Sequence, residues 1–186
     1  ELAETEDNLI EPIKMHIKAI VHRWMDPNGD GDPSDGIDGW RLDVAEMVPL
    51  GFWKEFRNWI NEINPNAFIT GEVWWEDYFN NKMYNASKWL KGDVFHSVMN
   101  YRFGDAVFKF FIDEKNKITQ KEFNDLLNAI ISDYGYDNVL QIQNVIGSHD
   151  NERLASACVN PDRWIDHANN LKYNPEFNVR KPNYNE

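Results

Sequence analysis

The sequence predicts an α/β fold in which helices alternate with the strands of a parallel sheet. Two observations support this fold class. Segments with apolar residues at spacings of three and four, typical of amphipathic helices, alternate with short runs rich in β-branched and aromatic residues, typical of strands. Strands joined by helices of this length form βαβ units, which build parallel sheets. The four strands expected here fit either a small open sheet or part of a closed barrel.

Two helices and the first strand are expected in the first third of the sequence. Residues 8–25 form a helix that Asp7 or Asn8 can cap. A loop, DPNGDGDPSDG, then leads to the first strand at 37–44. The apolar face of the next helix consists of Phe52, Phe56, Trp59, Ile60 and Ile63.

Three further strands are expected, at residues 67–74, 93–101 and 138–150. Two helices lie between the last two of them. One runs through 104–114, and the other begins at Thr119, where Thr119 and Glu122 have the spacing of a capping box. After the fourth strand, RLASACV predicts a short helix in which Cys158 is a packed core thiol. None of the four strands is followed by the glycine-rich turn of a nucleotide-binding sheet, which argues against that class.

The composition narrows the classes of partner. The 186 residues carry a net charge of −12, which disfavours nucleic acid and anionic membrane surfaces as partners and leaves neutral ligands such as sugars open. An aromatic content of 14%, with eight tryptophans, favours a folded core over disorder. No run of 18 apolar residues predicts a membrane span, and the single cysteine excludes an intrachain disulfide.

The first strand, in the segment GIDGWRLDVAEMV, carries charges where a buried strand would not need them. Alternation along a strand places Arg41 and Asp43 on one face. Trp40, Leu42 and Val44 lie on the other face, which we expect helices to cover. The charged pair is therefore directed at whatever occupies the opposite side of the sheet.

Three acidic residues, Asp43, Glu72 and Asp150, stand at the C-terminal ends of three predicted strands. In a parallel barrel this edge is where active sites are built. Asp43 and Glu72 follow consecutive strands, so we expect them side by side. Two carboxyl groups about 5–5.5 Å apart suit a retaining glycosidase, with one as nucleophile and the other as acid/base.

The surroundings of the two acids predict different ionisation behaviour. Arg41 would keep Asp43 ionised and oriented. Apolar neighbours, among them Trp74 and Trp75, would raise the pKa of Glu72 and keep it protonated. Simpler interpretations remain open for each residue alone, because an Asp at a strand end is often a helix cap and an Arg beside an Asp is often a structural ion pair.

Three segments resemble signature regions of the alpha-amylase family of glycoside hydrolases. DGIDGWRLDVA, ITGEVWWE and IGSHDNERLAS resemble its second, third and fourth regions, in the right order. VFHSVMNYRF is similar to its sixth strand. WMDPNGDGDPSDGIDGWRLDVA and NYRF are closest to the neopullulanase, cyclomaltodextrinase and maltogenic amylase group.

The resemblance implies a (β/α)8 TIM barrel. Residues 1–186 would then form part of a catalytic barrel domain, about the fourth to seventh strands with their helices, without the first three strands and the eighth. Four strands alone expose two sheet edges, so we expect the chain by itself to be unstable or inactive.

The resemblance also implies roles. Asp43 would be the nucleophile, Glu72 the acid/base and Asp150 a third carboxylate that binds sugar hydroxyls, while Arg41 and His149 would support the same subsite. The implied activity is hydrolysis of α-glucans with retention of configuration, and no cofactor is required for the chemistry. Transglycosylation is a close alternative, and a non-catalytic carbohydrate-binding homologue is an alternative of another class.

Glu46 and Met47 depart from the pattern of many family members. Those members carry a Lys-His pair at these two places after the nucleophile. The contribution of that pair to substrate or calcium binding is therefore not expected in this chain.

The loop before the first strand suggests a structural calcium ion. Five of its residues match the first half of a calcium-binding loop: Asp26, Asn28, Asp30, Gly31 and Asp32. Ile37 stands where the closing Glu would be. A turn-rich surface loop, whose Asp and Asn side chains bind its own backbone, is the alternative.

Trp74, Trp75 and Tyr78 have two open interpretations. They could stack on the faces of sugar rings, or they could belong to the core.

Overall fold

The computed structural model describes residues 3–5, 7–151 and 154–159. The chain divides into two compact units. The first unit contains Glu1–Met99 and Asp137–Gln143, and the second contains Asn100–Tyr136 and Asn144–Glu186. Among the described residues, none of the helices combines the length and apolar character needed to cross a bilayer.

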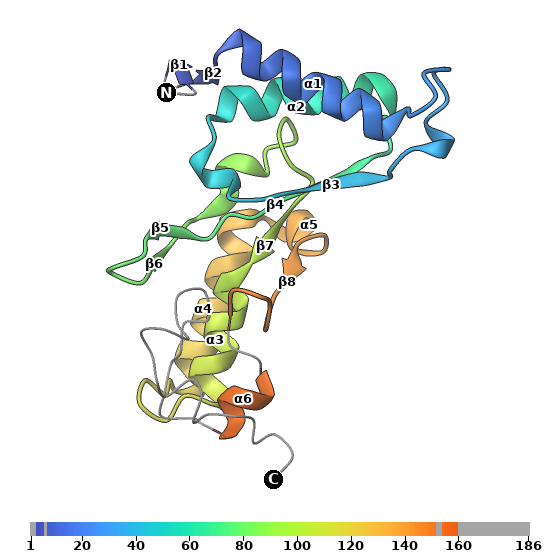
Figure 1. Ribbon diagram of the computed structural model, residues 1–186. Coiled ribbons are helices and arrows are strands. Elements are labelled where there is room, and N and C mark those ends of the chain that lie inside the picture. Colours follow the sequence, from blue (N-terminus) through green and yellow to red (C-terminus); the bar gives the residue numbers. More distant parts are fainter. Residues whose placement is uncertain (1–2, 6, 152–153, 160–186) are drawn as a thin grey trace. The chain divides into compact units, whose positions relative to one another are not determined.

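The sheet has the strand order β3-β4-β7-β8 (Figure 1). These strands are Gly39–Leu42, Phe68–Gly71, Ser97–Asn100 and Gln143–Asn144. The pairs β3–β4 and β4–β7 are parallel, with Leu42 opposite Gly71 and Gly71 opposite Val98. The predicted parallel α/β arrangement is therefore confirmed.

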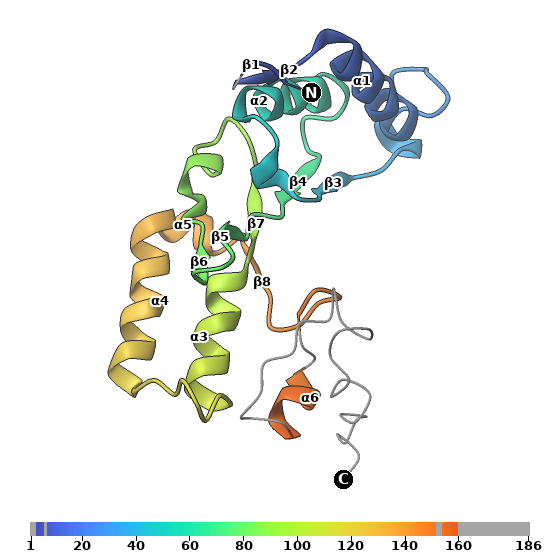
Figure 2. The same ribbon diagram turned by 60° about the vertical axis from the view of Figure 1, so that its left-hand side comes forward.

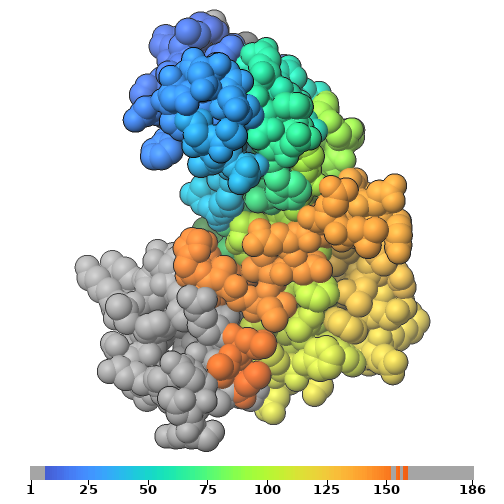
Figure 3. All heavy atoms as spheres, turned by 90° about the vertical axis from the view of Figure 1, so that its right-hand side faces the viewer, coloured from blue at the N-terminus to red at the C-terminus, as the bar shows by residue number. Residues whose placement is uncertain are grey.

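Two helices of the first unit pack together and cover one face of β3 and β4. Helices α1 (Glu11–Met25) and α2 (Leu50–Ile63) lie side by side in both ribbon views (Figures 1 and 2). In the space-filling view, the blue side chains of α1 form part of the outer surface of this unit (Figure 3). Trp40 of β3 reaches this layer, with its indole nitrogen 3.2 Å from the Met25 sulfur and its ring 5.9 Å from that of Phe56. The prediction that helices cover the Trp40 face is thus confirmed.

A tight contact fixes how closely β4 and the segment before β7 approach each other. Gly71 ends β4, and a Cβ atom on it would lie 2.3 Å from the Phe95 ring. Phe95 itself is fully buried. Glycine is therefore needed directly before Glu72 because a side chain would displace a core aromatic ring.

The rest of the first unit consists of short elements. An antiparallel pair, β1 (Ala3–Thr5) and β2 (Asn8–Leu9), precedes α1. A hairpin of β5 (Trp75–Asp77) and β6 (Lys82–Met83) follows β4. Short 3₁₀ helices lie at Pro33–Asp35, Ala45–Met47 and Ala86–Trp89.

The described part of the second unit is mainly helical. Helix α3 (Tyr101–Phe111) packs beside α4 (Gln120–Tyr134), and the rings of Phe110 and Phe123 stack between them at 4.6 Å. The expected capping box is present, since the Thr119 hydroxyl accepts from the Glu122 amide and the Glu122 carboxylate accepts from the Thr119 amide. Helix α3 begins earlier than expected because the Asn100 side chain caps it by accepting a hydrogen bond from the Phe103 amide.

Several boundary predictions were wrong. Helix α1 begins at Glu11, and Ile10 occupies the cap position without a side-chain hydrogen bond. Asn8 instead lies in β2 and donates its side-chain amide to Glu55 at 2.6 Å. The residue expected to cap the helix is therefore used to hold the β2 segment to α2.

The fourth strand is much shorter than the predicted 138–150. Residues Tyr136–Val139 form a short helix, α5, and only Gln143–Asn144 pair in the sheet. Local backbone hydrogen bonds explain the difference, because the Asn138 carbonyl accepts from the amides of Gln141 and Ile142. These short-range bonds compete with strand pairing in a segment that the apolar pattern alone assigns to the sheet.

The expected helix around Cys158 is present as α6 (Leu154–Val159). The expectation of a packed thiol is wrong, because Cys158 is exposed while Ala157 is buried. The helix places Ala157 inward and turns the Cys158 thiol outward.

Candidate active site

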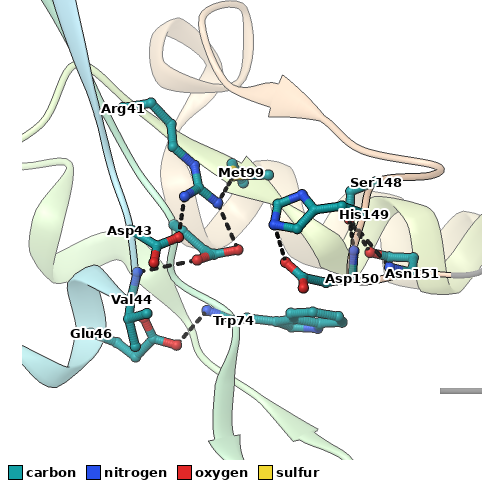
Figure 4. A network of polar contacts seen from close by, with 11 residues as sticks. Arg41, Asp43, Val44, Glu46, Trp74, Met99, Ser148, His149, Asp150 and Asn151 are labelled. Carbon is teal, nitrogen blue, oxygen red and sulfur yellow. Dashed lines mark hydrogen bonds and ion pairs between the residues drawn. The ribbon is translucent and has the colours of Figure 1, made fainter. Parts of the chain in front are cut away.

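The ends of β3 and β4 bring together an arginine and two carboxylates. The Arg41 guanidinium pairs with the Asp43 carboxylate through one nitrogen and contacts Glu72 Oε1 at 2.9 Å through another (Figure 4). A third contact, at 3.6 Å, joins Arg41 to the Met99 sulfur. The first unit thus places both acids within reach of one guanidinium.

The two carboxylates differ in accessibility. The Glu72 side chain is 8% exposed, whereas the Asp43 side chain is 68% exposed. A ligand from solution can therefore reach Asp43, whereas Glu72 is buried beside Arg41.

Glu72 is held in place by the turn that follows β3. Its second oxygen accepts a hydrogen bond from the Val44 amide at 3.1 Å. Its backbone continues the strand pairing, since its amide donates to Leu42 and its carbonyl accepts from Ala45. The position of Glu72 is thereby fixed by both its main chain and its carboxylate.

Val44 adopts an unusual conformation in this turn. Its φ is 50°, in the left-handed region, which is rare for a β-branched residue. Such strain costs on the order of 1–3 kcal/mol. The side chain is 46% exposed, so the expectation that Val44 continues the helix-covered face is wrong. The chain reverses at Val44, and this ends the alternation that the sequence pattern assumed.

The carboxyl group of Glu72 has two polar partners. Its oxygens contact the Arg41 guanidinium and the Val44 amide. The rings of Trp74 and Trp75 stack on each other with their centroids 5.1 Å apart. The effect of these indole rings on the ionisation of Glu72 stays a prediction.

Glu46 is a functional candidate to which the sequence assigned no role. Its Oε1 accepts a hydrogen bond from the Trp74 amide at 3.3 Å (Figure 4). Its buried Oε2 has no hydrogen-bond partner among the described residues. Burial raises the pKa of Glu46, and the nearby charge of Glu72 adds to the rise. The signal in the sequence was the acid three positions after Asp43, where many family members have a base.

Asp150 and His149 belong to the second unit. His149 Nε2 lies 3.0 Å from Asp150 Oδ2, and the Asp150 amide donates to the Ser148 hydroxyl. That hydroxyl in turn donates to Asn151 at 2.7 Å (Figure 4). The association of this group with Arg41 and the two acids of the first unit stays a prediction.

His96 has a structural environment. Its Nδ1 accepts from the Ile69 amide at 3.1 Å, and its Nε2 lies 3.0 Å from the Arg57 guanidinium. Burial lowers the pKa of His96, and the charge of Arg57 lowers it further. His96 therefore lies between β4 and α2 and contacts both.

The loop at 26–36 folds around its own backbone. Asp26 accepts from the amides of Gly29 and Gly31, and each of Asn28, Asp30 and Asp32 accepts from an amide two residues ahead. Within the described part of the chain, no three His, Cys, Asp or Glu side chains converge as metal ligands would. The side chains of this loop bind its own backbone amides, and calcium binding stays a prediction.

Comparisons with known proteins agree on one family. Residues 7–174 match the family model described as alpha amylase, catalytic domain. Neopullulanase 2 of Thermoactinomyces vulgaris is 36% identical over 78% of this chain and 22% of its own length. A cyclomaltodextrinase of Thermoanaerobacter pseudethanolicus is 44% identical over 63% of this chain and 19% of its own length. A solved cyclomaltodextrinase structure matches with a TM-score of 0.67 and 34% identity, over 80% of this chain and 22% of that one.

These matches show how much of each relative this chain corresponds to. It spans about one fifth of the length of the curated relatives it matches. The matched family model extends over most of the 186 residues. The chain therefore belongs to the alpha-amylase family.

Proposed function

We propose that residues 1–186 are part of the catalytic (β/α)8 barrel of a retaining glycoside hydrolase that cleaves α-glucans. Starch, pullulan, cyclodextrins and malto-oligosaccharides are the substrate class. The carrying observation is the Arg41 guanidinium bound to both Asp43 and Glu72 at the ends of neighbouring parallel strands. The names of the relatives, neopullulanase and cyclomaltodextrinase, support this class of substrate.

The position of the acids in the sheet also supports the proposal. Catalytic residues of such barrels lie at the C-terminal ends of parallel strands. Asp43 directly follows β3, and Glu72 directly follows β4. In this proposal, β3, β4, β7 and β8 are the fourth to seventh strands of the barrel.

In the first chemical step, the Asp43 carboxylate attacks the anomeric carbon of the sugar. Glu72 donates its proton to the glycosidic oxygen as the bond to that oxygen breaks, and the leaving sugar departs with the proton. The product on the protein is an ester between Asp43 and the sugar. Arg41 orients Asp43 for attack and holds Glu72 beside it.

In the second step, Glu72 accepts a proton from a water molecule that attacks the same carbon. The bond to Asp43 breaks and its carboxylate is regenerated. Two inversions at the anomeric carbon give net retention. His149 and Asp150 bind sugar hydroxyls in the ring that reacts. A sugar in place of the water would give transglycosylation.

The test is an assay of the complete enzyme that contains this chain, with starch, pullulan and a cyclodextrin as substrates. Asp43→Asn is expected to abolish release of reducing ends, and Glu72→Gln to lower it by about 10²–10⁴-fold. The matched control is Asp38→Asn, which removes an exposed carboxylate before the other end of the same strand. Proton NMR of the first product should show the α-anomer.

Three results would reject parts of the proposal. Full activity of Asp43→Asn would remove the nucleophile assignment, and a β-anomer as first product would remove the retaining mechanism. Binding of glucans without any turnover would favour a non-catalytic carbohydrate-binding protein.

A further inference from the structure

The hairpin that follows Glu72 is braced by its own hydrogen bonds. Asp77 accepts twice from Asn80, from its side-chain amide at 2.6 Å and from its backbone amide at 3.2 Å. Lys82 pairs with Glu76 across the two strands. The Tyr84 amide donates to the Trp74 carbonyl at 2.9 Å, closing the base of the hairpin. The turn of the hairpin is thus stabilised by its own side chains.

Aromatic rings form a continuous row from the base of the hairpin to its tip. Trp74 stacks on Trp75, and the rings of Trp75 and Tyr78 form a T-shaped pair with their centroids 5.4 Å apart. Phe79 then contacts Tyr78 at 5.8 Å. The row begins two residues after Glu72.

Within this chain, the outer end of the row is open to solvent. Phe79 is 93% exposed and Tyr78 is 42% exposed. Large aromatic rings grouped on a surface mark a binding site more often than scattered apolar residues do. In Figure 1, β5 and β6 extend away from β3 and β4 of the same unit.

The chemistry of the row favours a sugar chain as its occupant. The side chains of the row are flat aromatic rings, and Tyr78 also carries a hydroxyl. A pyranose ring has an apolar C–H face that can pack on an aromatic ring, and polar edges that can bind a hydroxyl. The acidic chain disfavours an anionic occupant. The row also starts at the proposed acid/base, so a glucan held there would continue along the hairpin.

We propose that the hairpin at 75–83 is a binding site for α-1,4-linked glucan chains, separate from the residues that act on the reacting bond. Tyr78 and Phe79 stack on sugar rings of the glucan that lie several residues away from the cleaved linkage. This inference rests on the proposed function, since the ligand is the chain that the enzyme cleaves. The hairpin would give the enzyme a preference for long substrates over short ones.

The first test measures binding without turnover. Complete enzyme with Asp43→Asn is run in native gels that contain glycogen, with Phe79→Ala and Tyr78→Ala added singly and together. Each single change is expected to weaken retardation on the order of fivefold. Tyr136→Ala removes an aromatic ring that is 67% exposed in the second unit, and this control should leave retardation unchanged.

Two replacements at Phe79 separate stacking from general apolar contact. Phe79→Trp keeps a flat ring and should retain glycogen binding. Phe79→Leu keeps apolar surface without a flat ring and should bind as weakly as Phe79→Ala. Equal binding by the Leu and Trp variants would overturn the proposal.

The second test uses the active enzyme. The ratio of kcat/KM for amylose to kcat/KM for maltotriose should fall about fivefold or more in the double variant.

An unchanged ratio in an enzyme that still cleaves maltotriose would reject the hairpin site and leave the proposed function standing. No cleavage by the unmodified enzyme would reject the proposed function, and the gel assay would still test the hairpin. A change in sedimentation coefficient without a change in glycogen binding would assign the row to a contact between two copies and overturn the proposal.

Discussion

Arg41 Nη2 lies 2.9 Å from Glu72 Oε1, so the side chain that orients Asp43 is also the counter-ion of a buried carboxylate on the neighbouring strand. Two strands and two acids depend on this one guanidinium.

Replacement of Arg41 should therefore affect both acids together. Arg41→Lys keeps the charge but loses the fork that reaches two carboxylates at once. We expect kcat/KM to fall about 10²-fold or more, and the free energy of unfolding to fall by about 1–3 kcal/mol because Glu72 loses a buried partner. Arg23→Lys, at an exposed arginine that donates to the Pro27 carbonyl, is the matched control. An Arg41→Lys enzyme with normal kinetics would show that the bridge is structural only.

Glu46→Gln should stabilise the complete enzyme at neutral pH. Because burial raises the pKa of Glu46, the folded state disfavours its charge, and the stability tied to its neutral form is lost as the pH rises through the raised pKa. Gln keeps the Oε1 acceptor for the Trp74 amide and carries no charge. Melting temperatures of wild type and variant should differ at pH 7 and converge below pH 4.5. A lower melting temperature for Glu46→Gln at pH 7 would contradict this prediction.

His96 should make stability depend on pH in the opposite sense. Its pKa is lowered in the folded state, so its contribution is complete above the ordinary value of 6.5 and is lost as the pH falls toward the lowered value. His96→Asn retains an acceptor near the Ile69 amide and cannot titrate. The loss of stability between pH 6.5 and 5, followed by denaturant unfolding, should become smaller in this variant. His22→Asn, at an exposed position of α1, should leave that loss as it is.

Gly71→Ala should destabilise the fold next to the site. The added Cβ would lie 2.3 Å from the Phe95 ring, and overpacking of this kind costs about 1–3 kcal/mol. The double variant Gly71→Ala/Phe95→Leu removes the clash and should recover part of the loss. Additive losses in the double variant, measured by thermal melting, would show that the two residues are not in contact.

Much of the architecture followed from local pattern. The apolar face of α2, the capping box at Thr119 and the parallel pairing of β3 with β4 are consequences of residue spacing, and spacing is visible in the sequence. The cluster of Arg41 with the two acids follows from the same logic, because residues at the ends of neighbouring parallel strands share an edge.

Other features depend on contacts that spacing does not encode. Val44 adopts a left-handed backbone conformation, and its amide donates a hydrogen bond to the carboxylate of Glu72, 28 residues away. In the segment at 138–150, the Asn138 carbonyl accepts local hydrogen bonds from Gln141 and Ile142, and the strand is confined to Gln143–Asn144. The Glu46 carboxylate accepts from the Trp74 amide, 28 residues away, which the spacing of the two residues does not predict.

The bond between the Val44 amide and Glu72 couples the reaction to the backbone. In the proposed cycle, Glu72 gives up its proton and regains it once per turnover. A hydrogen bond to an ionised acceptor is about twice as strong as one to a neutral acceptor. The turn that carries Asp43 should therefore stiffen while the sugar is attached and slacken when the product leaves. The protonation state of Glu72, at the end of β4, would then set the rigidity of the turn after β3. That rigidity would change once in each catalytic cycle.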